Sequence, residues 1–212
     1  MTDTLSMPAE GDAAPGFTLA ADGGGRVSLD DFRGKALVLY FYPKADTSGC
    51  TKQAQGFSAL SRDFAKAGTA VVGVSADPVR ALDKFKAKYG LDLALAADES
   101  HKTLEDYGVW AEKSMYGRSY MGIERTTFLI DKAGRIAKVW RKVKVPGHAE
   151  EVLAAVKDLS PDPSLQGRAE RGAPGWGKTP SESRLVPRLH PARTQGVRVR
   201  PPLKGRDQEV TE

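Results

Sequence analysis

The sequence contains no asparagine, a single cysteine and three histidines in 212 residues. Without asparagine there is no N-glycosylation acceptor, and one cysteine cannot build the disulfide framework of a small secreted domain. No apolar run is long enough to cross a membrane as a helix. His101 and His148 are far apart and have no neighbouring cysteine, so we expect neither a metal site nor another cofactor.

The first twelve residues include acidic side chains and lack an apolar core. We therefore expect no secretory signal. Together with the single, unpaired cysteine, this composition predicts a cytoplasmic protein without a membrane-bound segment.

Proline and positive charge are concentrated at the C-terminal end. Residues 160–212 hold eight of the 13 prolines and ten basic against six acidic residues, which is +4 of the net charge of +5. A segment so rich in proline and so poor in apolar residues is typical of disorder. We therefore predict a folded domain over residues 1–159 and a disordered tail over residues 160–212. The nearly neutral domain gives no reason to expect a nucleic-acid partner.

Gly172–Thr179 matches the pattern of a phosphate-binding loop. That loop works only where a strand enters it and a helix leaves it. The flanking residues are polar or proline-rich, so we expect no nucleotide site here.

A buried strand leads to the single cysteine. Ala36–Tyr42 is a short apolar run that Pro43 ends, which is typical of a strand covered on both faces. Thr51–Ala67 repeats apolar residues at spacings of three and four, which predicts one amphipathic helix. Cys50 is therefore expected at a helix N-terminus.

A cysteine in this position is suited to nucleophilic chemistry. The first turn of a helix presents unpaired N–H groups and a partial positive charge, and both stabilise a thiolate. The alternative is a buried structural cysteine, which is common in protein cores. Because Ser48, Gly49 and Thr51 are small or polar, we expect an exposed, reactive thiol.

These residues resemble a known family. Pro43, Thr47 and Cys50 form Pro-x-x-x-Thr-x-x-Cys, which is the pattern of the peroxidatic cysteine in peroxiredoxins. The surrounding Phe41–Ala54 is similar to the peroxiredoxin Q branch, also called bacterioferritin comigratory protein.

The resemblance extends over residues 8–159. In Ile123–Asp131, Arg125 stands at the position of the family's catalytic arginine. Two positions depart from the branch: Ser48 replaces its usual proline, and Gln55 stands where many members have a second, resolving cysteine.

The resemblance implies an α/β fold of the thioredoxin-like type with peroxiredoxin additions, namely an N-terminal β-hairpin and a central mixed sheet flanked by helices. The apolar patterns agree with strands alternating with helices. A turn at Asp22–Gly25 would join the strands of the hairpin. Further strands are expected at 69–76, 91–96, 125–130 and 134–144, and helices at 79–89, 99–107 and 148–159.

The segment before Arg125 is rich in large apolar residues, and two interpretations of it stay open. It could belong to the core or form the apolar wall of a peroxide pocket. Its large residues are Trp110, Met115, Tyr116, Tyr120 and Met121.

The resemblance also implies the chemistry. Cys50 attacks a hydroperoxide and becomes a sulfenic acid, while Arg125 stabilises the developing negative charge. Thr47 would orient the sulfur and the peroxide, and Pro43 would shield them from water.

With no second cysteine, an external thiol must reduce Cys50. The candidates are thioredoxin and the glutaredoxin/glutathione system, and the resemblance suggests a monomer or a weak dimer. A second hypothesis is a peroxide sensor or holdase whose cysteine is oxidised once as a signal.

Overall fold

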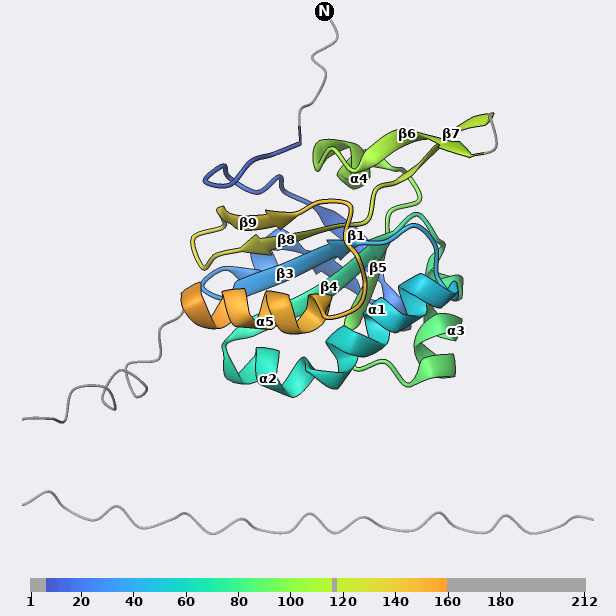
Figure 1. Ribbon diagram of the computed structural model, residues 1–212. Coiled ribbons are helices and arrows are strands. Elements are labelled where there is room, and N and C mark those ends of the chain that lie inside the picture. Colours follow the sequence, from blue (N-terminus) through green and yellow to red (C-terminus); the bar gives the residue numbers. More distant parts are fainter. Residues whose placement is uncertain (1–6, 116–117, 160–212) are drawn as a thin grey trace, which may run out of the picture. The chain divides into compact units, whose positions relative to one another are not determined.

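The computed structural model describes residues 7–115 and 118–159 of the chain (Figure 1). Three predicted features lie outside the described residues: the disordered tail, the match to a phosphate-binding loop at Gly172–Thr179, and Tyr116. None of the described helices is long and apolar enough to span a bilayer.

The described residues form a mixed sheet of seven strands in the order β2-β1-β5-β4-β3-β8-β9. The strands are β1 (Thr18–Ala21), β2 (Arg26–Ser28), β3 (Ala36–Phe41), β4 (Thr69–Ser75), β5 (Ala94–Ala97), β8 (Thr126–Ile130) and β9 (Ile136–Trp140). In the middle, β3 runs parallel to β4 and antiparallel to β8. All six residues of β3 are buried, which confirms the strand predicted from the apolar run.

Helices cover the two faces of the sheet unequally (Figure 1). One face carries α1 (Ser48–Ala59), α2 (Ser61–Lys66), α3 (Val79–Tyr89) and α5 (His148–Leu159). The other face carries α4 (Lys102–Asp106) and a two-stranded hairpin of β6 (Trp110–Met115) and β7 (Arg118–Ile123). Alternate residues of β3 serve two cores: Val38 and Tyr40 face the four helices, and Leu37 and Leu39 face the opposite side.

Gly73 in β4 makes room for the buried ring of Tyr40. It lies beside Tyr40 in the parallel register. A Cβ atom at Gly73 would lie 2.5 Å from Cζ of Tyr40. Phe57 of α1 stacks on the same ring at a centroid distance of 4.8 Å, so the ring is held between the sheet and α1.

The single helix predicted over Thr51–Ala67 is wrong, because the chain breaks at Leu60 into α1 and α2. Serines on both sides of the break bond to Asp92. Its backbone N donates to Oγ of Ser58 at 2.7 Å, and its carboxylate accepts from Oγ of Ser61 at 2.7 Å. This tertiary contact favours the break over the continuous helix that the apolar spacing indicates.

The N-terminal hairpin is confirmed. β1 and β2 pair antiparallel across a short 3-10 turn, η1 (Asp22–Gly24), and Gly23 has a φ of 73°. A second 3-10 turn, η2 (Leu29–Phe32), follows. The predicted helices over 79–89 and 148–159 are found with the same bounds, and the strand predicted at 91–96 is found at 94–97. The elements predicted at 69–76, 99–107, 125–130 and 134–144 are present but shorter.

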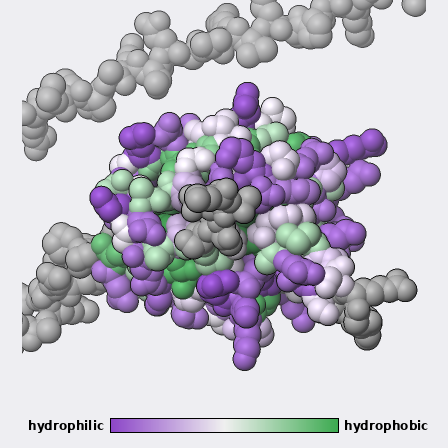
Figure 2. Space-filling model, turned by 90° about the horizontal axis from the view of Figure 1, so that it is seen from above, coloured by the Kyte–Doolittle hydropathy of each residue, from purple (hydrophilic) through white to green (hydrophobic). Residues whose placement is uncertain are grey.

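The β6–β7 hairpin was not predicted. Tyr120 and Met121 on β7 are 45% and 50% exposed, so neither belongs to the core. Trp110 is half-buried and stacks on His101 at a centroid distance of 4.1 Å. The face seen in Figure 2 is mostly hydrophilic, with hydrophobic residues in small separate patches.

Candidate active site

Cys50 is the third residue of α1, which follows β3 after a loop of residues 42–47. Thr47 is the N-cap residue, and the first hydrogen bond of the helix joins N of Thr51 to O of Thr47 at 2.8 Å. The expected position at a helix N-terminus is confirmed. The partial positive charge of the first turn therefore acts on the sulfur.

The sulfur is buried rather than exposed. Cys50 is only 2% exposed and belongs to the core cluster that contains Tyr40, Tyr42 and Ala54. The expectation of an exposed thiol is wrong because a third-position side chain turns toward the sheet, where residues distant in sequence cover it. One of these is Arg125.

Arg125 lies just before β8, and its side chain reaches the sulfur. It directly precedes Thr126, which pairs with Phe41 at the end of β3. Its backbone O accepts a hydrogen bond from N of Val143 at 2.9 Å, and its Nη2 donates to Sγ of Cys50 at 3.2 Å. A guanidinium therefore faces the single cysteine at the helix N-terminus.

Gln53 holds the guanidinium from the other side. It lies one helical turn beyond Cys50, is 3% exposed, and accepts a hydrogen bond from Nη1 of Arg125 at Oε1. Within the described part of the chain, its Nε2 is buried without a hydrogen-bond partner. Sequence reasoning missed Gln53, since a glutamine in a helix carries no pattern that reveals such a contact.

Two tyrosines complete the surroundings of the sulfur. Burial raises the pKa values of Tyr40 and Tyr42 well above the usual value, and repulsion from Asp77 adds to this effect for Tyr42. Both phenols therefore stay protonated near neutral pH. Neither hydroxyl has a hydrogen-bond partner among the described residues.

Two other titratable groups lie near Arg125. Lys113 of β6 donates from Nζ to the carbonyl of Ile123, and its pKa is lowered first by burial and also by repulsion from Arg125. His148 lies within 2.9 Å of Oγ1 of Thr127 through Nε2, and burial lowers its pKa. His148 is thus part of the packing between α5 and β8.

Thr47 and Pro43 lie on the loop between β3 and α1, and both are exposed. The Thr47 hydroxyl donates to O of Lys44 at 3.0 Å. No hydrogen bond joins Thr47 to Cys50 among the described residues, so the hydroxyl is available to a ligand as an acceptor.

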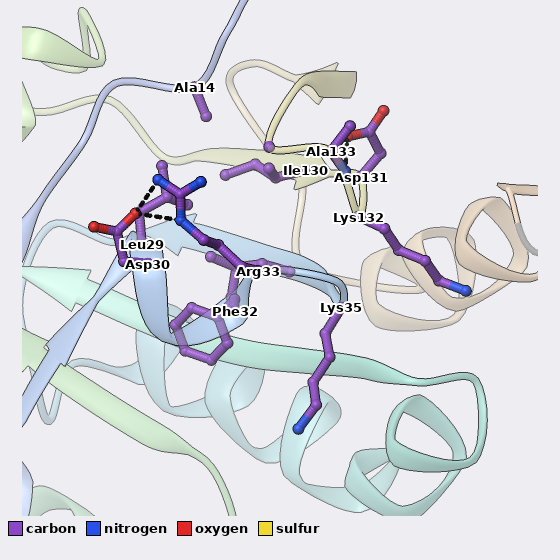
Figure 3. A pocket seen from close by; sticks show the side chains of 12 residues that line it. Ala14, Leu29, Asp30, Phe32, Arg33, Lys35, Ile130, Asp131, Lys132 and Ala133 are labelled. Atoms are coloured by element: carbon purple, nitrogen blue, oxygen red, sulfur yellow. Dashed lines mark hydrogen bonds and ion pairs between the residues drawn. The ribbon is translucent and has the colours of Figure 1, made fainter.

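A cavity of about 360 Å³ lies at the end of the sheet opposite to Cys50 (Figure 3). It is bounded by the start of β3 and the end of β8, with Lys35 and Lys132 extending away from it. The Asp131 carboxylate already accepts from N of Ala133 and N of Arg135. Five of its twelve lining residues are charged, but Asp131 is engaged by these backbone N–H groups and Asp30 is paired with Arg33.

The Cys50 end offers the more reactive combination. It brings together a thiol, a helix N-terminus, a guanidinium that donates to the sulfur, and buried donors without partners. Such a group can stabilise a thiolate and the charge that appears when a polar bond is attacked.

Comparisons with known proteins agree in pointing to one group. A family model described as the AhpC/TSA family matches residues 10–139. A putative peroxiredoxin bcp of Coxiella burnetii is 52% identical over 143 residues, which cover 68% of this chain and 95% of that protein. Peroxiredoxin Bcp of Bacillus subtilis is 47% identical over 150 residues, which cover 71% of this chain and 96% of that protein.

A solved structure of peroxiredoxin Q from Xanthomonas campestris aligns with a TM-score of 0.65 at 44% identity, over 67% of this chain and 90% of that one. Another structure from that organism concerns the alkyl peroxide reduction activity of its bacterioferritin comigratory protein. Serine mutants at two different cysteines of peroxiredoxin Q have been solved, whereas the present chain has one cysteine in all.

Proposed function

The chain belongs to the AhpC/TSA family, among the peroxiredoxins of the Bcp or peroxiredoxin Q type, and on that premise we propose that Cys50 is its peroxidatic cysteine. Peroxiredoxins are thiol peroxidases, and this chain is one. The observation that carries the assignment of the site is the 3.2 Å hydrogen bond from Arg125 to the Cys50 sulfur at the start of α1.

In the first step, the Cys50 thiolate attacks the terminal oxygen of a hydroperoxide. A sulfur–oxygen bond forms as the oxygen–oxygen bond breaks, and the departing oxygen takes a proton from solvent and leaves as water or an alcohol. Arg125 stabilises the thiolate and the charge on the departing oxygen through two donors on one planar group. Gln53 supports this role by fixing the guanidinium, since it binds Nη1 while Nη2 binds the sulfur.

Thr47 and Pro43 act on the peroxide from the loop. We propose that the Thr47 hydroxyl accepts a hydrogen bond from the peroxide, supported by its donation to O of Lys44, which leaves its oxygen lone pairs free. Pro43 would limit the access of water at the mouth of the site.

In the second step, an external thiol attacks the sulfenic acid and releases water, and a second thiol frees Cys50. We propose thioredoxin as the main reductant, with the glutaredoxin/glutathione system as the alternative, because the chain has no second cysteine. Hydrogen peroxide and organic hydroperoxides would be the substrates. The enzyme would act in the cytoplasm as a monomer or weak dimer, in antioxidant defence, with no nucleic-acid partner.

Turnover distinguishes this function from a peroxide sensor or holdase. The full chain is mixed with excess hydroperoxide and a thioredoxin system, and peroxide loss is followed beyond one equivalent per Cys50. We expect many equivalents to be consumed, and none by Cys50→Ser, because a serine hydroxyl is hardly ionised near neutral pH. Consumption that stops at one equivalent with every reductant would favour the sensor.

A further inference from the structure

The loop between β3 and α1 is attached to the segment that joins β4 to α3. N of Tyr42 donates a hydrogen bond to O of Val74 at 3.1 Å. Further along the loop, N of Ala45 donates to Oδ2 of Asp77 at 2.7 Å. Tyr42 and Ala45 are both buried, whereas Thr47 is exposed. None of the steps proposed for the peroxide uses Asp77.

One peptide group connects Asp77 to Thr47. This group joins Lys44 to Ala45: its carbonyl O accepts from the hydroxyl of Thr47 at 3.0 Å, and its N–H donates to Asp77. Because a peptide group is planar and its N–H and C=O point in opposite directions, fixing one end of the group fixes the other. The carboxylate also polarises the group, which makes the carbonyl a stronger acceptor for the hydroxyl.

The carboxylate of Asp77 is itself held in place. Its Oδ2 accepts from Oγ of Ser75 at 2.9 Å, and Ser75 is fully buried. N of Asp77 donates to the same Oγ at 3.3 Å. Ser75 is the last residue of β4, so the central sheet determines where the carboxylate lies.

The residue before Thr47 has a backbone conformation that its surroundings must hold. Asp46 has a φ of 59°, which is uncommon for a residue other than glycine. Its carboxylate accepts from Nζ of Lys88 at 2.8 Å and from the hydroxyl of Tyr89 at 2.6 Å, both at the end of α3. The turn that leads into Thr47 is therefore held on one side by Asp77 and on the other by α3.

We propose that Asp77 is a positioning residue of the peroxidase reaction, which orients the hydroxyl of Thr47 through the Lys44–Ala45 peptide group. This inference rests on the proposed function and deepens it. A hydroxyl hydrogen directed to the carbonyl leaves the oxygen lone pairs for the peroxide. Without the carboxylate the peptide group is free to turn, so the hydroxyl loses the fixed direction that the attack requires.

The test measures the second-order rate constant of the full chain with hydrogen peroxide, by stopped-flow, in a double-mutant cycle. Asp77→Ala removes the carboxylate, and Thr47→Val removes the hydroxyl while keeping the shape of the side chain. With Thr47 present, Asp77→Ala should lower the rate constant by about three- to tenfold, the size of one hydrogen bond. In the Thr47→Val chain, Asp77→Ala should cause no further loss, because the group that it positions is already absent.

Two more variants separate positioning from a general loss of structure. Asp83→Ala is the matched control: Asp83 is also half-buried and accepts from a backbone N, that of Gly23 at 2.8 Å, but it connects α3 to η1. This variant should lower the urea midpoint and leave the rate constant unchanged. Asp77→Asn keeps an oxygen that can accept from N of Ala45, so its rate constant should lie closer to the parent's than that of Asp77→Ala.

An equal loss from Asp77→Ala with and without the Thr47 hydroxyl, or no loss in either case, would overturn the positioning role. If Asp77→Ala does not fold, Ser75→Ala removes the hydroxyl that holds the carboxylate, and its loss must show the same dependence on Thr47. If the parent consumes no peroxide, the proposed function itself is wrong. If Thr47→Val keeps the parent's rate constant, the peroxidase function stands and the positioning role is wrong.

Discussion

The two ends of β3 differ in how their polar groups are used. At its N-terminal end, the cavity of Figure 3 is large, but Asp131 is engaged by backbone N–H groups, Asp30 is paired with Arg33, and the lysines extend outward. At its C-terminal end, Cys50 is almost fully buried beside a guanidinium, two protonated phenols and an amide whose nitrogen has no partner among the described residues.

The difference shows that cavity size is a poor guide to chemistry in this molecule. A hydroperoxide group is small, so its reaction needs a few fixed donors in a dry place more than it needs volume. β3 places these donors because its end, the start of β8 and the N-terminus of α1 meet at one edge of the sheet.

The prediction with the largest effect compares the two ends of β3 directly. Arg125→Ala should lower the second-order rate constant with hydrogen peroxide by about 100- to 1,000-fold, because it removes charge stabilisation in the transition state. Arg33→Ala removes an arginine from the remote cavity, where it pairs with Asp30, and should leave the rate unchanged. Equal losses in both variants, measured by stopped-flow peroxide consumption, would remove the distinction between the ends.

A smaller effect tests the packing beneath the reactive end. Gly73→Ala places a Cβ atom against the fixed ring of Tyr40 and should lower the free energy of unfolding by about 1–3 kcal/mol. Gly16→Ala is the matched control, since no atom lies within 4 Å of a Cβ atom there. Urea denaturation of both variants checks this, and an unchanged midpoint for Gly73→Ala would show that Tyr40 moves freely.

Gln55→Cys tests whether the first turn of α1, which carries Cys50, can unwind. Gln55 is exposed on α1, and residues five apart in an intact helix lie roughly 8 to 9 Å apart, beyond the reach of a disulfide at about 7 Å. We expect a disulfide with Cys50 after one equivalent of peroxide, and better resistance to sulfonic acid, only through unwinding of the first turn. Mass spectrometry that finds the new thiol free and Cys50 overoxidised as in the parent would show that this turn stays closed.

The smallest effect concerns the residues beyond α5, whose C-terminal end points away from the start of α1 (Figure 1). A chain ending at Leu159 should keep its melting temperature and its peroxidase rate, because we propose that residues 1–159 form the complete catalytic domain. Calorimetry and steady-state assays compare it with the full chain. A large fall in either would give residues 160–212 a structural or catalytic role.

The sequence predicts those helices and strands whose own residues carry an apolar or turn pattern. The apolar run of β3, the turn glycines of the first hairpin and the helical spacing of α5 all have the predicted type, because burial on one or two faces leaves a periodic record in the chain. Pro43, Thr47, Cys50 and Arg125 are predicted as site residues from their pattern, and the structure brings Cys50 and Arg125 into contact.

Other features depend on contacts between distant residues and have no local pattern. The spacing of Phe57 and Phe64 indicates one helix, and only Asp92 reveals the break at Leu60. The burial of Cys50 and the bond from Arg125 to Gln53 likewise arise where separate elements meet. The β6–β7 hairpin has both faces partly exposed, so its strands show no clear alternation.

The contacts of α1 with the rest of the domain determine which part of this helix can unwind. Its C-terminal end is tied through Ser58 to Asp92 and through Phe57 to the ring of Tyr40, while its first turn carries the exposed Ser48. The C-terminal half of the helix is therefore held against the rest of the domain, while the first turn is held by the burial of Cys50 and its bond from Arg125. Movement that brings oxidised Cys50 toward a reductant can stay confined to the turn around residues 48–51, and the sheet need not take part.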